Sequence, residues 1–245
     1  TPFKLTFNLL QHTTHEFDSI TNVNKALKKS LQNQFIPAMN YTYTYDDSPI
    51  TSRRNHLWWQ ASVTQAGLVL DGIYALAGKK FNQEDKELLG NPFAQFIKGT
   101  AEIRYNYALG HKQYLVGRLM AGASYGNART SPYNEQFYIG GANSIRAFTI
   151  RSIGPGRYYQ NSDNNKYAYI DRTGDLKFEA NLEYRFPILG DLHGATFLDS
   201  GNIWLIRNDP DRPGGQLKWG SFLKDLALGT GFGLRYDLTF IVIRF

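Results

Sequence analysis

A strict alternation of apolar and polar side chains constrains this chain more than any other feature. In residues 176–187 the even positions are apolar throughout, whereas the odd positions up to 185 are polar or charged. Successive side chains of a β-strand point to opposite faces of the sheet, so this segment has one apolar face and one charged face. The charged face carries Lys177, Glu179, Asn181, Glu183 and Arg185.

The same alternation recurs along the chain and predicts about nine antiparallel strands, many longer than the roughly 5–6 residues usual in soluble sheets. The segments between them are alternately short and long, as in transmembrane β-barrels with short turns at one end and long extracellular loops at the other. A soluble β-sandwich is the alternative, but it rarely combines such strands with a long loop at every second connection. The predicted strands are 3–9, 39–46, 57–64, 97–105, 111–127, 176–187, 192–206, 224–237 and 239–245.

The long connections are expected at about 10–34, 71–92, 128–175 and 207–223. Two of these connections have apolar residues at the spacing of a short helix, at 22–31 and 82–89. We expect these helices only to pack within their loops.

Nine strands do not close a bacterial single-chain barrel, which uses an even number, and unpaired strand edges in lipid are costly. Residues 1–245 are therefore expected to form one partial barrel domain, a piece of a larger barrel.

The composition argues against several kinds of site. The chain has no cysteine, and therefore no disulfide framework, thiolate nucleophile or cysteine metal site. A formal charge of +6 selects no partner, since long loops that carry Lys and Arg explain it. His12 and His15 lack the glutamate of a metalloprotease helix, and no nucleophile elbow or P-loop is present. We expect no catalytic residue, no cofactor, no metal and no nucleic-acid partner.

One arginine lies among small and apolar residues within the long segment 128–175. A guanidinium is always charged and needs acceptors for its five N–H donors, so Arg146 is expected to have an acidic partner elsewhere in the fold. Asp199 and Glu183 are the candidates, because both occupy inward-facing positions of adjacent predicted strands. For Asp199, a solvated charge in the barrel interior is the alternative. The residues around the arginine include Gly140, Gly141, Ile145, Ala147 and Phe148.

Three glycines on one face of a later strand leave room for another segment. Gly229, Gly231 and Gly233 share the inward-facing positions of that strand. Glycine weakens a strand unless another backbone must approach closely. We predict that segment 128–175 folds into the barrel against this glycine face and that Arg146 holds it there. Bending of the barrel wall is the alternative explanation of the glycines.

Together these pieces resemble the C-terminal barrel of the Omp85 superfamily, in its surface antigen D15 (BamA/TamA) branch. The matching motifs are Gly-Gly-Ala-Asn-Ser-Ile-Arg-Ala-Phe at 140–148, Phe-Leu-Asp-Ser-Gly at 197–201 and Gly-Thr-Gly-Phe-Gly-Leu-Arg at 229–235. The resemblance covers most of the chain and is strongest from about 91 to 245. It implies the C-terminal portion of a sixteen-stranded barrel, with the first strands, the last strand and the periplasmic POTRA domains outside this sequence.

The resemblance also implies roles for individual residues. Arg146 would lie on the inward-folded loop and pair with Asp199, with Glu183 as a second acceptor. Ala147 stands where the family usually has glycine. Alanine disfavours a positive φ, so the tip of the loop either uses an ordinary backbone conformation or is strained.

The function implied by the resemblance is non-enzymatic insertion and folding, or translocation, of other proteins at the outer membrane of a Gram-negative bacterium. Its partners would be outer-membrane lipids, client outer-membrane or secreted proteins, and periplasmic or surface accessory proteins. A two-partner secretion pore of the same superfamily, a passive porin and an outer-membrane enzyme such as a phospholipase are the alternatives.

Overall fold

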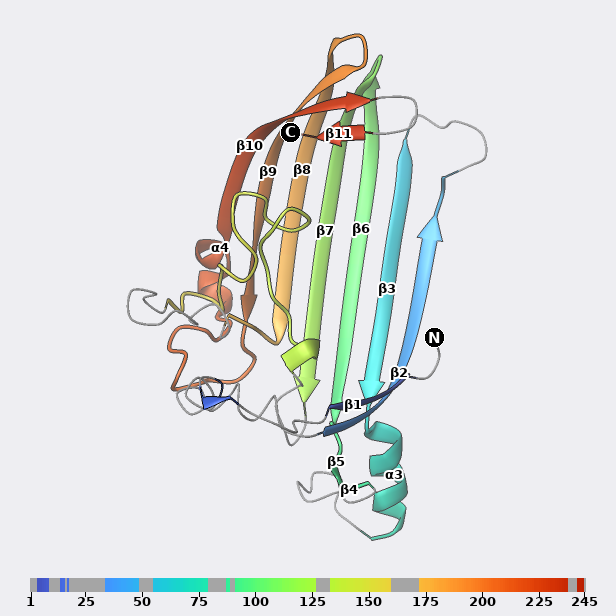
Figure 1. The fold of residues 1–245 in the computed structure, drawn as a ribbon, viewed down its shortest axis with the longest axis vertical. Helices are drawn as coiled ribbons and strands as arrows, with labels where there is room; N and C mark the ends of the chain where they lie inside the picture. Colours follow the sequence, from blue (N-terminus) through green and yellow to red (C-terminus); the bar gives the residue numbers. More distant parts are fainter. Residues whose placement is uncertain are drawn as a thin grey trace.

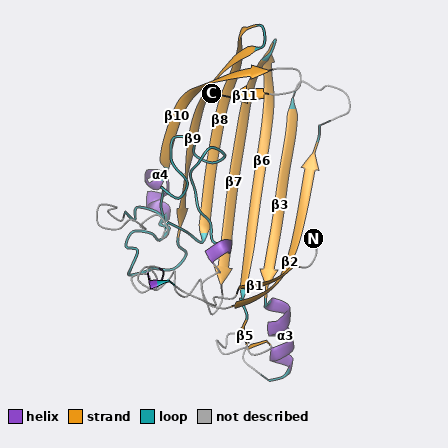
Figure 2. Cartoon of the chain, in the orientation of Figure 1, coloured by secondary structure: helices purple, strands orange, loops and turns teal. Residues whose placement is uncertain are grey.

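The computed structural model describes residues 4–8, 14–15, 17, 34–48, 55–78, 87–88, 91–126, 133–159, 172–237 and 242–244. Its body is a nine-stranded antiparallel sheet in the order β1-β2-β3-β6-β7-β8-β9-β10-β11, with β1 and β11 at its edges (Figure 1). Long curved strands dominate the molecule, and helices are few (Figure 2). The all-β antiparallel prediction is therefore confirmed. The strands are β1 Lys4–Asn8, β2 Gln34–Asp46, β3 His56–Ala66, β6 Phe96–Gly110, β7 Gln113–Gly126, β8 Leu176–Leu189, β9 Leu192–Trp204, β10 Ala227–Asp237 and β11 Val242–Arg244.

The outer face of the sheet carries the apolar positions of the alternation. Ile103, Leu119, Leu182, Leu198 and Leu228 are all substantially exposed, which suits a surface in contact with lipid. Along β6, the distance from Ile97 to Tyr107 is about 33 Å at a rise of about 3.3 Å per residue. For strands tilted by about 40°, that length spans about 25 Å along the membrane normal, the usual height of the apolar band.

Aromatic side chains gather on the outer face toward the short-turn end. Trp59 contacts Tyr43 and Tyr45 with ring centroids 5.1 and 6.4 Å apart, and Tyr184 stacks on Phe186 at 5.4 Å. Such aromatic girdles mark the membrane–water interface of outer-membrane barrels.

The connection after β3 differs from the prediction. A helix, α3 Leu68–Leu76, begins directly after β3, whereas Glu87–Leu88 is strand β4 and pairs with β5, Asn91–Pro92. The predicted helix at 82–89 is therefore wrong where the structure describes that segment. Its residues have helical spacing, but β4 and β5 pair with each other instead. The predicted helix at 22–31 lies outside the described residues.

Helix α3 is attached to the end of the sheet by polar and aromatic contacts. Its N-cap, Gly67, has a φ of 73°, and a Cβ there would lie 2.4 Å from the carbonyl oxygen of Ala94. Asp71 is fully buried and accepts a hydrogen bond from Gln95 Nε2 at 2.9 Å. Within the described residues, no helix has the length and apolar character needed to cross a bilayer.

Candidate functional site

The long segment between β7 and β8 folds over the inner face of the sheet. Figure 1 shows residues 133–159 of this segment lying across β8 and β9. Its apolar side chains form a small core against the wall, in which Ile139 and Ile145 are fully buried together with Ile203 of β9. Phe137 and Ile153 complete this cluster. The loop therefore carries its own apolar base.

The loop tip, residues 140–148, is closed by hydrogen bonds between its own backbone groups. Gly141 N–H donates to Phe148 O at 2.8 Å, and Phe148 N–H donates to Ile145 O at 3.1 Å. Gly140 has a φ of 103°, and a Cβ there would lie 2.2 Å from the carbonyl oxygen of Thr149. Glycine is thus required at this position by both conformation and space.

The backbone at position 147 does not require glycine, although the family usually has glycine there. The non-glycine residues with positive φ in the described chain are Lys112 and Arg151, at 57° and 58°. Ala147 therefore uses an ordinary backbone conformation, and the strained residue lies further along the loop, at Arg151.

Arg146 projects from the tip onto a carboxylate of the wall. Its Nε and Nη2 donate to the two oxygens of Asp199 at 2.9 and 2.8 Å, and its backbone N–H donates to Oδ2 at 2.9 Å. Asp199 is fully buried, so the carboxylate of this bidentate pair is shielded from water, whereas the Arg146 side chain is 26% exposed. The single carboxylate thus holds both the main chain and the side chain of Arg146.

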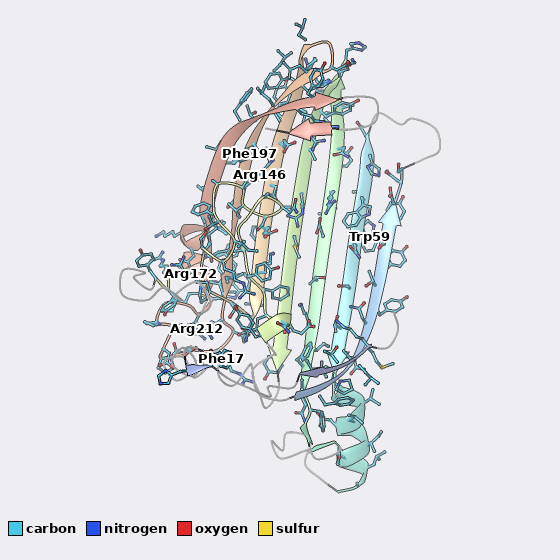
Figure 3. All side chains as sticks on the ribbon, viewed as in Figure 1. Phe17, Trp59, Arg146, Arg172, Phe197 and Arg212 are labelled. Atoms are coloured by element: carbon cyan, nitrogen blue, oxygen red, sulfur yellow. The ribbon has the colours of Figure 1, made fainter. Side chains whose placement is uncertain are left out.

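A second carboxylate and an aromatic ring complete the surroundings of the guanidinium. Arg146 Nη1 donates to Glu183, whose other oxygen accepts from Arg185 Nε at 2.6 Å. The guanidinium carbon lies 3.7 Å from the centroid of the Phe197 ring (Figure 3). We call Arg146, Asp199 and Glu183 the latch.

Beside the latch lies an ionic network that the sequence did not single out. Glu179 of β8 is fully buried, accepts from Ser144 Oγ of the loop tip, and accepts from Arg118 Nη1 at 2.9 Å. Asn181 Nδ2 donates to Ser144 O at 2.7 Å and to Asp199 Oδ1 at 2.9 Å. The alternation did place Glu179 and Asn181 on the inner face, but nothing in the sequence indicated that the loop would cover them.

The predicted glycine face only partly receives the loop. A Cβ on Gly229 would lie 2.8 Å from the Ala147 Cβ, so the tip does occupy that position. A Cβ on Gly231 would instead meet the Phe197 ring at 2.6 Å, and Gly233 lies further along, opposite Ala195. The prediction of one groove over all three glycines is therefore wrong, because Phe197 fills the middle of it.

Another ion pair holds the loop at the long-loop end of the sheet. Arg157 Nε donates to Asp225 Oδ1 at 2.6 Å, and Asp225 lies in the short helix α4, Phe222–Asp225. Asn202 bridges the same two segments, since its Nδ2 donates to Gly156 O at 3.0 Å and to the backbone oxygen of Asp225. These residues were not predicted, because no pattern marks which loop charges meet.

Asp175 lies where the loop rejoins β8. Its Oδ2 accepts a hydrogen bond from Ile206 N–H at 3.0 Å. Burial raises the pKa of the Asp175 carboxyl above its ordinary value of 3.8, against the opposing effects of that hydrogen bond and of Arg212 and Arg207. This carboxylate therefore carries a cost at neutral pH.

The carboxylates on the inner face of β6, β8 and β9 are paired with arginines. Glu102 and Glu179 accept from Arg118, whereas Glu183 and Asp199 accept from Arg146. Paired carboxylates of this kind neutralise charge and fix geometry. The arrangement is suited to holding a loop in place.

A model of the Omp85 superfamily domain matches residues 5–245 of this chain. Among curated proteins, the outer membrane protein assembly factor BamA of Nitratidesulfovibrio vulgaris is 31% identical over 173 residues, which is 64% of this chain and 20% of that protein. BamA of Neisseria meningitidis is 28% identical over 37% of the chain and 11% of its own length. Outer envelope protein 80 of Arabidopsis thaliana chloroplasts is 28% identical over 69% of the chain and 20% of its own length.

Among solved structures, BamA of Haemophilus ducreyi lacking POTRA domains 1–3 aligns with 89% of this chain and 51% of its own, with 14% identity and a TM-score of 0.43. The chain thus spans a fifth or less of the length of the curated relatives it matches.

The family match extends over almost all of the sequence. The sheet has the long antiparallel strands and the apolar outer face of an integral outer-membrane protein of Gram-negative bacteria. This chain belongs to the Omp85 superfamily of outer-membrane β-barrel proteins.

Proposed function

We propose that this chain is the C-terminal barrel wall of a BamA/TamA-like factor that inserts other outer-membrane proteins or moves them across the membrane. The observation that carries the proposal is the latch. A buried, bidentate pair between Arg146 and Asp199 fixes a long loop against the inner wall. In such a barrel the fixed loop would brace one part of the wall while other strands move.

The proposed activity is non-enzymatic. A client strand would pair with an exposed strand edge of the complete barrel, in the manner of β-augmentation, and main-chain hydrogen bonds would hold it. The apolar outer face would keep the client next to lipid during insertion. Client outer-membrane or secreted proteins, lipids and periplasmic or surface accessory proteins are the proposed partners.

The test is depletion of the full-length protein in its own host. We expect the amount of folded outer-membrane barrels to fall and to recover when the wild-type gene is supplied. An Asp199→Asn gene should restore less, whereas Asn40→Ala, a polar change on the inner face far from the latch along the sheet, should restore fully. The amount of each variant in the outer membrane is measured in parallel, so that a loss of activity is separated from a loss of protein.

Other outcomes would select the alternatives. A large, stable conductance of the purified full-length protein, with no effect of depletion on other barrels, would indicate a passive porin. Loss of one secreted protein, with normal barrel assembly, would indicate a secretion pore. Lipid turnover abolished by a single Ser or His substitution would indicate an enzyme.

A further inference from the structure

A separate cluster of polar side chains lies at the short-turn end of the sheet, where β2 ends and β3 begins. Asp46 and Asp47 follow one another at the end of β2, and His56 is the first residue of β3. Among the described residues, this cluster is the group of His, Asp and Glu side chains whose potential ligand atoms all lie within 4.8 Å of one another. It shares no residue with the latch.

The backbone holds both carboxylates in place. Asp47 N–H donates to Leu57 O at 3.1 Å, and Leu57 N–H returns a hydrogen bond to Asp47 Oδ1 at 2.7 Å. Asp46 Oδ1 accepts from Ser48 N–H at 2.8 Å. Both bonds are accepted by Oδ1. A carboxylate oxygen has two lone pairs, so each of these oxygens can also bind a cation.

The imidazole is directed at the same point. His56 Nε2 lies 2.7 Å from Asp46 Oδ1 and 3.8 Å from Asp47 Oδ1. Its other nitrogen, Nδ1, lies 3.4 Å from the side-chain amide of Asn106, the residue opposite it on β6. With that amide turned by 180°, its oxygen accepts from Nδ1–H, and the lone pair of Nε2 then faces the carboxylates.

This donor set has the chemistry of a transition-metal site. Imidazole nitrogen and carboxylate oxygen bind Zn²⁺ at about 2.0–2.2 Å, which separates tetrahedral ligands by about 3.4 Å. The observed separations of 2.7 and 3.8 Å bracket that distance. An imidazole ligand also favours Zn²⁺ over Mg²⁺ or Ca²⁺, which prefer oxygen alone. The three side chains are 21–49% exposed, so water can reach the site and complete the coordination.

We propose that Asp46, Asp47 and His56 bind one divalent transition-metal ion, which ties the end of β2 to the start of β3. In the absence of metal, the imidazole instead donates to Asp46. On binding, the imidazole proton moves to Nδ1 and Nε2 becomes a ligand. The sequence shows no metal motif here, because the pairing of two strands brings the ligands together.

The full-length protein in detergent is first stripped of metal with EDTA. It is then titrated with Zn²⁺, and calorimetry measures the binding. Co²⁺ serves as a second probe, because its visible absorption reports nitrogen and oxygen coordination. We expect saturable binding of one ion that His56→Ala abolishes. Asp47→Asn should weaken it strongly while its remaining side-chain oxygen keeps the bond from Leu57 N–H. Asn106→Ala, which removes only the group that orients the ring, should weaken binding by about 10- to 100-fold.

The matched control is His111→Ala, since His111 lies exposed in the neighbouring turn between β6 and β7, outside the cluster. This variant should bind Zn²⁺ as the wild type does. Equal affinity of wild type and His56→Ala, or equal losses in His56→Ala and His111→Ala, would overturn the proposal and leave a plain ion pair at this site. Heat-dependent gel mobility shows that each variant is folded before it is titrated.

Discussion

The two halves of the sheet have the same alternation of apolar and polar residues, but their inner faces differ in how they are covered and in which polar groups they carry. In β7 to β10 the loop covers the inner face, and the polar residues there are mostly ionic, with Glu179 and Asp199 fully buried. In β2 and β3 the inner face is more open, and its pairs are largely between hydroxyl and amide groups. Asn40 Nδ2 donates to Thr64 Oγ1 at 2.8 Å, and Ser62 contacts Thr100 at 2.6 Å.

The difference follows from the solvent available to each half. Hydroxyl and amide groups exchange partners with water at little cost, so an open face tolerates them. A buried carboxylate without a cation is far more costly, so a covered face needs arginines placed to meet it. Arg118 of the wall and Arg146 of the loop serve this purpose. The covered half should therefore be specific and sensitive to substitution, and the open half tolerant.

Asp199→Asn should produce the largest difference between the halves. This change removes the charged partner of Arg146 in a buried site. Breaking such a pair lowers the free energy of unfolding by about 3–5 kcal/mol. We expect about 3 kcal/mol here, because Glu183 still accepts a hydrogen bond from Arg146. The loss of stability is measured by urea unfolding of the full-length protein in detergent, with gel mobility as the readout. Asn40→Ala in the open half should cost about 1 kcal/mol or less. Equal losses would remove the distinction between the halves.

Gly229→Val should have the next largest effect. Its Cβ would lie 2.8 Å from the Ala147 Cβ and force the tip away from the wall, and overpacking of this kind costs about 1–3 kcal/mol. Gly99→Val is the matched change, because nothing lies within 4 Å of a Cβ at Gly99. We expect faster protease cleavage of the loop in Gly229→Val alone. A loop that stays protected in that variant would contradict the packing described here.

Phe197→Leu tests the ring beneath the guanidinium. Removing it should cost about 1–2 kcal/mol, since Arg146 is largely desolvated and its guanidinium carbon lies 3.7 Å from the ring centroid. The counterpart in the open half is Trp58→Leu, where the Arg104 guanidinium lies 4.7 Å from the ring and is half exposed. That change should cost about 0.5–1 kcal/mol. The two melting temperatures, compared at one pH, provide the measurement.

Asp175→Asn should have the smallest effect and the opposite sign. Burial raises the pKa of Asp175, so the folded state binds its proton more tightly than the unfolded state does. The resulting cost is absent below the ordinary pKa of 3.8 and fully present above the raised one. The variant keeps an oxygen for Ile206 N–H and should melt slightly higher than wild type at pH 8. The two should coincide near pH 3.5; a difference that is independent of pH would contradict this account.

Much of the sheet was predictable because the period of the side chains alone assigns strands and faces. The pattern also placed Glu183 and Asp199 on one face of adjacent strands, where the structure has them. The N-terminal limits of β2 were less clear, since Gln34–Ala38 does not alternate cleanly and its inner side chains Ile36 and Ala38 pack into a small core.

The remainder depended on where the loop lands, which no local pattern encodes. Glu179 and Glu183 look equivalent in the sequence, yet the former is fully buried under Ser144, whereas the side chain of the latter is 17% exposed. Gly231 and Gly229 look equivalent too, but only the latter contacts the tip, since the Phe197 rotamer fills the space between. Tertiary contacts decide such cases, and a single sequence does not contain them.

Asp199 binds Arg146 through the backbone N–H as well as through the side chain, and this has a genetic consequence. An ordinary ion pair can be inverted, because exchanging the two charges restores the attraction. Here an arginine at 199 would face a backbone donor that needs an acceptor, so the exchange would leave that donor unmatched. Suppressors of an Asp199 mutation should therefore arise in the tip or its apolar base rather than as a swapped charge.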